Sequence, residues 1–240
     1  HPSNYRIVGF TAEVPLEELV RIAHARGLVL IDDVGAGALL DFTRFGFTDQ
    51  PALPDSVRAG SDIITSSADK LIGGSQGGII LGKAALIEKV RKNPLARILR
   101  VGKLTLAALE ATLGLFFDEA AAAREVPTLA MLSRDLSSLA QAAERIAAAV
   151  GAKAPGATVA SVDGASEMGS GSLPARPIPT RLVSVAAPGV SADDLAARLR
   201  RHEPPVFARI ADGRVLLDPR TLLDGEEKIV IDALVAALSA

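Results

Sequence analysis

The stretch I-I-T-S-S-A-D-K-L-I-G-G-S-Q-G-G-I-I-L-G, Ile63 to Gly82, decides the fold because it places one lysine between two strands. β-Branched and apolar residues at its two ends predict one strand over Ser61–Ser66 and another over Gly77–Gly82. Asp69 and Lys70 follow the first strand, and the glycines of the connecting turn allow its backbone to approach an anion closely. Ligands of open α/β sheets collect at strand ends, so we expect the functional site around Lys70.

A second fragment of the same kind lies upstream, where L-V-L-I-D-D-V-G-A-G (Leu28 to Gly37) ends a hydrophobic strand with acids and glycine. A carboxylate at one strand end and a lysine at a later one suit a pyridoxal phosphate site, in which the carboxylate keeps the ring nitrogen protonated. Neighbouring residues of a strand point to opposite faces, so only one of Asp32 and Asp33 can reach such a cofactor. A solvated loop lysine remains the alternative for Lys70 on these residues alone.

The composition is that of a globular chain able to bury a sizeable core, because 49% of its 240 residues are hydrophobic. No apolar run approaches the roughly 18 residues that a membrane-spanning helix needs. The absence of cysteine excludes a disulfide framework, a thiolate nucleophile and a cysteine zinc site, and three scattered histidines argue against a histidine metal site. We therefore expect a cytoplasmic protein of one or two domains without a metal.

The formal charge of -2 argues against a stand-alone RNA-binding module, which would ordinarily be basic, and aromatic residues for base stacking are only 3% of the chain. One segment, Lys83 to Lys103, is locally basic and holds the single acid Glu88. Within it, the i and i+3 spacing of Arg97 and Arg100 predicts two guanidinium groups on one side of a helical turn. Such a pair is suited to binding an oxyanion, and Lys103 belongs to the same basic patch. A solvated basic face is the alternative.

The first half of the chain alternates strand and helix, which predicts a mainly parallel sheet covered by helices on both faces. The expected strands are Tyr5–Thr11, Leu28–Asp33, Ser61–Ser66 and Gly77–Gly82, and the expected helices are Pro15–Arg26, Asp55–Ala59, Ala84–Arg91 and Lys103–Phe117. A boundary near Arg124 to Pro127 divides a large domain, residues 1–123, from a small C-terminal α/β domain, residues 124–240.

The second half is expected to form shorter elements. We predict an alanine-rich helix over Ser133–Val150 capped by Ser133, and a loop-rich region over Ala154–Pro179. The run Gly169 to Pro174 in that region is a candidate flexible substrate loop. The remaining expected elements are a strand at Arg181–Val185, a helix at Ser191–Arg201, a hairpin of Val206–Ile210 and Arg214–Leu217 turned at Asp212-Gly213, and a terminal helix from Glu226.

Three runs carry a resemblance to a known family: S-A-D-K-L-I-G-G-S-Q-G-G-I-I-L-G-K around Lys70, N-P-L-A-R-I-L-R-V-G-K-L-T-L-A-A-L-E-A-T-L from Asn93, and S-N-Y-R-I-V-G-F-T from Ser3. Together they resemble the bacterial L-seryl-tRNA(Sec) selenium transferases, the selenocysteine synthases. The resemblance covers nearly the whole chain and is strongest from His1 to Leu113. The pattern D-K-L-x-G-G-x-Q-x-G-I-I-x-G is specific for that group and its close relatives.

This resemblance implies a fold-type-I pyridoxal phosphate enzyme whose site residues match positions of this chain. Lys70 would form the internal aldimine beside Asp69, and Asp33 would face the ring nitrogen. The family's cofactor-phosphate and donor-binding positions match Gly73, Gly74, Gln76, Arg97, Arg100 and Lys103. The implied reaction converts seryl-tRNA(Sec) to selenocysteinyl-tRNA(Sec) through an aminoacrylyl intermediate, with selenophosphate as the selenium donor.

The resemblance also implies a homo-oligomer built from dimers, in which the glycine turn reaches the cofactor phosphate of a partner subunit. Few residues precede Asp33, so we expect a C-terminal fragment that lacks part of the large domain and the family's helical amino-terminal domain. Two alternatives stay open. One is a related pyridoxal phosphate lyase acting on a small amino acid or amino sugar, and the other is a catalytically silent fragment that serves assembly or tRNA docking.

Overall fold

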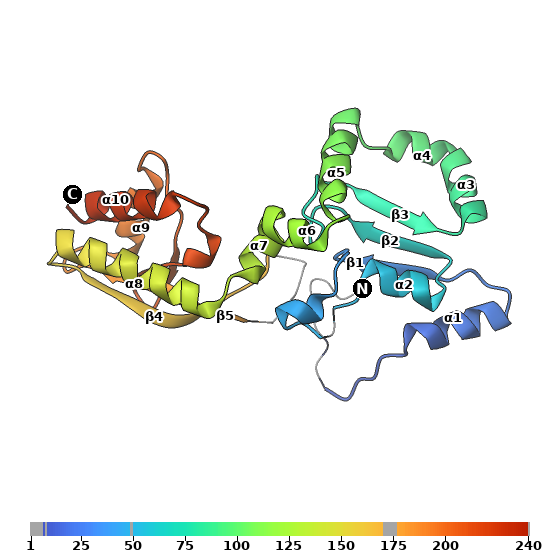
Figure 1. Ribbon diagram of the computed structural model, residues 1–240, viewed down its shortest axis with the longest axis horizontal. Helices are drawn as coiled ribbons and strands as arrows, with labels where there is room; N and C mark the ends of the chain where they lie inside the picture. Colours follow the sequence, from blue (N-terminus) through green and yellow to red (C-terminus); the bar gives the residue numbers. More distant parts are fainter. Residues whose placement is uncertain (1–6, 8, 49, 170–176, 240) are drawn as a thin grey trace. The chain divides into compact units, whose positions relative to one another are not determined.

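A computed structural model describes residues 7, 9–48, 50–169 and 177–239 (Figure 1). The chain forms two compact units, one of His1–Ser133 with Met168–Arg176 and one of Arg134–Glu167 with Pro177–Ala240. The sequence placed the boundary earlier, between residues 123 and 124. Helices α6 (Glu119–Glu125) and α7 (Pro127–Ser133) pack on each other, and α6 also packs on α5 (Lys103–Leu115), which keeps both helices in the first unit.

The first unit is built on a three-stranded sheet in the order β1-β2-β3, formed by Ile31–Gly35, Ile63–Ser67 and Gly78–Gly82 (Figure 1). Strands β1 and β2 are parallel, as predicted, whereas β2 and β3 are antiparallel. A parallel return would need a crossover of about a dozen residues or more, and the turn between β2 and β3 is shorter. The sheet is therefore mixed rather than mainly parallel over the residues that the structure describes.

The helices predicted for this unit are confirmed with small shifts at their ends. They are α1 (Leu16–Ala25), α2 (Leu53–Ala59), α3 (Ala84–Lys92) and α5, joined by a 3-10 helix at Phe42–Phe45 and by α4 (Pro94–Leu99), where only a helical turn at Arg97 and Arg100 was predicted. Of the expected strand Tyr5–Thr11, residues 5, 6 and 8 lie outside the described part, and Gly9 and Phe10 form a bend.

The two faces of this sheet differ in their surroundings. On one face, Val34 and Ile64 are buried against Leu109 and Leu113 of α5, and burial of each such side chain contributes about 1.5–3 kcal/mol. The other face carries Asp33 and Thr65 between Ile31 and Ile80, and these two isoleucines are 64% and 48% exposed. The core thus lies on one side of the sheet, and Asp33 stands on the open side.

The second unit is a four-stranded antiparallel sheet in the order β4-β5-β7-β6, formed by Thr158–Ser166, Ile178–Ala186, Arg214–Leu217 and Arg209–Ala211. The prediction of loop over Ala154–Pro179 is wrong where β4 forms. Its small residues give a weak strand pattern, and the strand is stabilised by pairing with β5 along its whole length, from Thr158 opposite Ala186 to Ser166 opposite Ile178. Of the candidate substrate loop Gly169 to Pro174, residues 170–174 lie outside the described part.

Three helices pack around one hydrophobic core with this sheet: α8 (Leu136–Lys153), α9 (Ala192–Arg200) and α10 (Glu226–Ser239). Asp135 caps α8 by accepting a hydrogen bond from Ser138 N, so the predicted cap at Ser133, which belongs to α7, is wrong. The predicted turn is confirmed, because Asp212 and Gly213 both have positive φ, as a two-residue hairpin turn requires. Within the described ranges, no helix is long and apolar enough to cross a membrane.

Candidate active site

The parallel pairing of β1 and β2 brings two segments to one edge of the sheet. One is the end of β1, which carries Asp33, and the other is the turn of residues 68–77 between β2 and β3, which carries Lys70 and is called the lysine turn. Asp33 lies level with Thr65, and the segments that follow both strands leave the sheet at the same end. Beyond the strands, Leu71 N–H donates to Ala36 O at 3.2 Å, which joins the lysine turn to the chain after β1. The edge predicted from the two strand ends is therefore formed.

Asp33 presents an exposed carboxylate whose orientation is fixed from the neighbouring strand. The Thr65 hydroxyl donates to Asp33 Oδ1 at 2.8 Å, while Asp32 is half-buried and level with Ile64 on the opposite face. The prediction that the two acids point to opposite faces is confirmed by this register. Thr65 was missed, although a hydroxyl residue within an apolar strand was a visible signal.

The lysine turn is closed by its own backbone. Gly73 N–H donates to Lys70 O at 3.0 Å, and Gly74 N–H donates to Ala68 O at 2.9 Å. Lys70 is half-buried and Asp69 is exposed. The lysine thus starts from a backbone whose conformation is set by hydrogen bonds within the turn.

Two glycines of the turn are required by packing within the unit. Gly73 has a φ of +72°, and a Cβ there would lie 2.7 Å from Val126 Cγ1. A Cβ on Gly74 would lie 2.8 Å from Leu109 Cδ1. Packing alone therefore explains why both positions are glycine. Gln76 is exposed. The roles predicted for Gly73, Gly74 and Gln76 at a cofactor phosphate stay predictions.

Gly37 holds the two strand ends in backbone contact. Its φ is +74°, and any Cβ there would collide with Ser66 Oγ and lie 2.7 Å from Ser67 O. Only glycine fits both the left-handed conformation and the missing space. The chain that follows Asp33 therefore passes directly against the end of β2.

Arg97 and Arg100 do not share a helical turn, so that part of the prediction is wrong. Helix α4 ends at Leu99, and Arg100 has an extended backbone with φ −62° and ψ 139°. The helix is short because the chain must turn before α5 begins at Lys103, with Gly102 as its N-cap. Both arginines and Lys103 are exposed.

Arg100 borders a hollow of about 750 Å³ that Arg97 does not line. We name it the β3–α4 groove. Its walls come from β3, α3, α4 and the start of α5, and its lining includes Gly78, Ile80, Lys89, Leu99, Arg100 and Leu106. Sequence reasoning placed Lys89 in the basic segment but gave it no role.

A buried carboxylate stabilises the base of the sheet. Asp62 accepts hydrogen bonds from Lys83 Nζ, from Leu30 N at 2.7 Å and from His24 Nε2 at 3.0 Å. These bonds, the one from Lys83 above all, hold the pKa of Asp62 well below its usual range. The carboxylate thus joins α1, the start of β1 and the end of β3.

We expect Asp62→Asn to lower the melting temperature at neutral pH, because the amide cannot accept all three bonds. The folded-state pKa is depressed, so the stabilisation is fully present above the unfolded pKa of about 4 and is lost as the pH falls further. The melting temperatures of wild type and variant should therefore converge on acidification. Glu110→Gln, at an exposed acid of α5, is the control, and parallel curves for Asp62→Asn would contradict this assignment.

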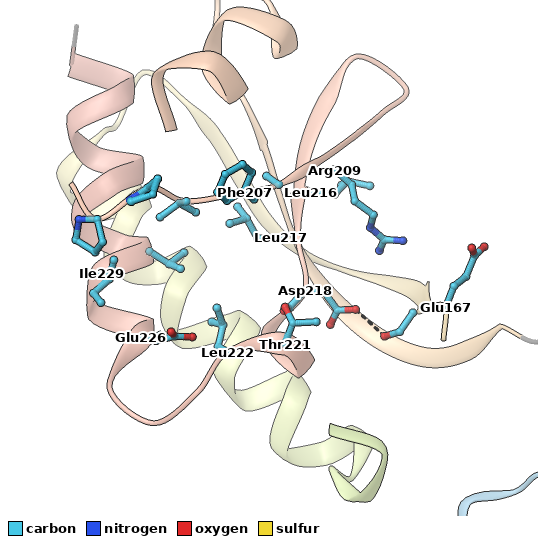
Figure 2. Close-up of a pocket in the computed structure, with 16 residues that line it drawn as sticks. Glu167, Phe207, Arg209, Leu216, Leu217, Asp218, Thr221, Leu222, Glu226 and Ile229 are labelled. Atoms are coloured by element: carbon cyan, nitrogen blue, oxygen red, sulfur yellow. Dashed lines mark hydrogen bonds between the residues drawn. The ribbon is translucent and has the colours of Figure 1, made fainter. Parts of the chain in front are cut away.

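The second unit has its own hollow, of about 580 Å³, beside strand β7 (Figure 2). Phe207, Leu216 and Leu217 form an apolar part of its lining, and Asp218 lies beside them. Ser166 Oγ donates to Asp218 Oδ2 at 2.6 Å, the bond drawn in Figure 2. The Asp218 carboxylate belongs to the internal hydrogen-bond network of this unit.

Arg220 is the centre of that network and is buried. Its Nε donates to Ser166 Oγ at 3.0 Å, its Nη2 to Pro179 O at 2.7 Å and its Nη1 to Arg134 O at 3.3 Å. Burial lowers the pKa of its guanidinium. The side chain thus joins the end of β4 to the start of β5. Sequence reasoning missed it, although an arginine directly after a strand and a proline was a signal.

The fold belongs to the fold-type-I pyridoxal phosphate enzymes. A solved structure of D-glucosaminate-6-phosphate ammonia-lyase is similar at a TM-score of 0.54 and 21% sequence identity, over 95% of this chain and 53% of that one. The family model described as SelA: L-seryl-tRNA selenium transferase matches residues 1–223. The chain therefore belongs to the L-seryl-tRNA selenium transferase family.

Curated relatives agree with this assignment. The L-seryl-tRNA(Sec) selenium transferase of Nitratidesulfovibrio vulgaris is 48% identical over 240 residues, which cover 99% of this chain and 51% of the relative. That of Geobacter sulfurreducens is 46% identical over 235 residues, which cover 98% of this chain and 51% of the relative. The chain spans about half the length of the curated relatives it matches.

Proposed function

We propose that this chain is part of a pyridoxal phosphate-dependent, cytoplasmic enzyme that converts L-seryl-tRNA(Sec) to L-selenocysteinyl-tRNA(Sec) with selenophosphate. The observation that carries the proposal is the shared sheet edge, where the parallel strands β1 and β2 place Asp33 and the Lys70 turn together in a chain of this family. The large exposed apolar side chains Ile98 and Leu104 support a homo-oligomer built from dimers.

The residues at this edge fit pyridoxal phosphate. Asp33 is exposed and has one oxygen engaged by Thr65, which leaves Oδ2 to face a protonated ring nitrogen. Lys70 would hold the cofactor and carry a proton at Nζ, beside Asp69. When bound, the cofactor supplies an electron sink for the substrate's α-carbon.

Thr65 has a defined part in this proposal. Its hydroxyl donates to Asp33 Oδ1 from the adjacent strand, so the carboxylate is oriented before any ligand binds. A carboxylate that is already oriented loses less conformational freedom on binding. Thr65 is thus a positioning residue that acts through Asp33.

The selenium donor would be held by Arg97, Arg100 and Lys103. Guanidinium groups present fixed pairs of donors that match a phosphate-like anion, and both arginines are exposed to solvent. Because Arg100 has an extended backbone outside α4, the two arginines approach the donor from separate positions. The replacement of the serine hydroxyl by selenium then takes place beside the lysine turn.

The full-length enzyme should convert seryl-tRNA(Sec) in the presence of selenophosphate, with the attached amino acid identified by mass spectrometry. Arg97→Ala and Arg100→Ala should each raise the KM for selenophosphate roughly ten- to 150-fold, because each removes a charge-assisted contact. Cofactor absorbance should stay unchanged in both variants.

Lys92→Ala is the matched control, because Lys92 Nζ is paired with Glu88 at 3.1 Å and lies outside the proposed donor site. An equal rise in KM for Lys92→Ala would show that only the general positive charge matters. Release of a free product from a small amino acid or amino sugar, with no dependence on tRNA, would instead identify a lyase and overturn the proposed function.

A further inference from the structure

We propose that the β3–α4 groove binds the 3′-terminal nucleotides of the aminoacyl-tRNA substrate. Its aliphatic walls would pack against a nucleobase, and Lys89 would pair with an adjoining phosphate, while Arg100 holds the selenium donor at the border of the groove. This inference rests on the proposed function and adds a nucleotide subsite, made of residues of this chain, next to the site of the reaction.

The groove has the size and walls of a ligand site. Its volume of about 750 Å³ falls within the roughly 300–1,000 Å³ typical of small-molecule pockets. Ile80, Leu99 and Leu106 line it, and these residues are 48%, 76% and 52% exposed. Such open aliphatic surfaces can be buried against the face of a base by the hydrophobic effect, without base-specific hydrogen bonds.

The charges of the groove select an anion. Lys89 and Arg100 are the charged residues that line it, and no carboxylate does. Within the described part of the chain neither has an ion pair, whereas Arg91 and Lys92 on the same α3 helix are both paired with Glu88. Lys89 is therefore available to a phosphate of the nucleotide, and Arg100 to the selenium donor.

The combination of walls and charges favours a nucleotide over other ligands. A small inorganic anion would use the cations but leave the aliphatic walls exposed, and an apolar protein segment would bury both cations without partners, which is costly. Gly78, the residue directly after the lysine turn, lines the groove. Arg100 lines it as well. A 3′ end bound here is thus held against the chain segment that leads back to Lys70.

The test uses the full-length holoenzyme and a fluorescently labelled, single-stranded RNA oligonucleotide that ends in CCA. Lys89→Ala should raise its Kd and reduce the slope of log K against log salt by about 0.7, the value for one lost phosphate contact on a single strand. Leu99→Ala should raise the Kd roughly tenfold, with the salt slope unchanged, because it removes apolar surface that is buried against a base. Lys92→Ala should leave both quantities unchanged.

Unchanged Kd values for Lys89→Ala and Leu99→Ala would overturn the inference. A loss of oligomer mass in light scattering of Leu99→Ala, with RNA binding intact, would overturn it in favour of a contact between subunits. Equal binding of inorganic polyphosphate, insensitive to Leu99→Ala, would overturn it in favour of a simple anion site. Cofactor absorbance, measured alongside, confirms that each variant is folded.

Failure of the proposed function gives a different result. An enzyme that does not convert seryl-tRNA(Sec), yet binds the oligonucleotide through Lys89 and Leu99, would contradict the reaction while supporting the nucleotide subsite. Conversion that proceeds with an unchanged KM for seryl-tRNA(Sec) in Lys89→Ala and Leu99→Ala would support the reaction and overturn the subsite.

Discussion

Lys70→Ala is expected to abolish the visible absorbance of the holoenzyme and to reduce conversion of seryl-tRNA(Sec) to the background rate. The amine of Lys70 is the group proposed to hold the cofactor, and alanine provides no replacement for it. In the wild-type enzyme, borohydride reduction followed by peptide mass spectrometry should find a pyridoxyl group on the peptide that contains Lys70. Lys70→Arg keeps the positive charge and should fail in the same way, which separates attachment from charge.

The neighbouring lysines provide the comparison for this experiment. Lys83 Nζ is engaged by the buried carboxylate of Asp62, and Lys103 is the first residue of α5. A pyridoxyl group on either lysine, with none on the Lys70 peptide, would show that the lysine turn does not hold the cofactor. The proposed roles of Asp69 and Asp33 would then lose their basis as well.

Arg220→Ala is expected to destabilise the second unit by about 3–5 kcal/mol, the usual cost of removing one partner from a buried charged network. The substitution leaves the carbonyls of Pro179 and Arg134 and the hydroxyl of Ser166 without their guanidinium donors. Each buried polar group left unpaired contributes about 1–3 kcal/mol to the loss. Hydrogen exchange of the full chain should show faster exchange of β4 and β5 amides.

Peptides from β1 to β3 provide the internal reference, because they belong to the other compact unit. Arg214→Ala, at an exposed arginine of β7, is the matched variant and should leave the exchange of β4 and β5 unchanged. Arg220→Lys should have an intermediate effect, since an ammonium keeps the charge but not the planar set of donors. An effect of Arg220→Ala no larger than that of Arg214→Ala would contradict the role given to this side chain.

The parts of this fold that follow from local sequence pattern were predictable. The strands on either side of the lysine turn, helix α5, and the hairpin turned at Asp212-Gly213 depend on periodicity and turn chemistry that lie close together in the sequence. The edge that joins Asp33 and Lys70 was also predictable, because parallel strands must end on the same side of a sheet.

The parts that depend on distant partners were not predictable. Strand β4 has a weak pattern of its own and is held by pairing with β5. The orientation of Asp33 comes from Thr65 on another strand, and the contacts of Asp62 and Arg220 join segments far apart in the sequence. The separation of Arg97 from Arg100 depends on where a short helix ends, which neighbouring elements decide.

The close contact between Gly37 and the main chain at the end of β2 sets the distance between Asp33 and the lysine turn. Repacking of side chains can absorb many substitutions by rotamer changes, and Ser66 Oγ could rotate away from a Cβ at position 37, but the main-chain Ser67 O, 2.7 Å away, could not. A single methyl group there would push the two strand ends apart and separate the acid from the amine. In a screen of random mutants for lost activity, Gly37 would therefore score with the catalytic positions, although it carries no functional group.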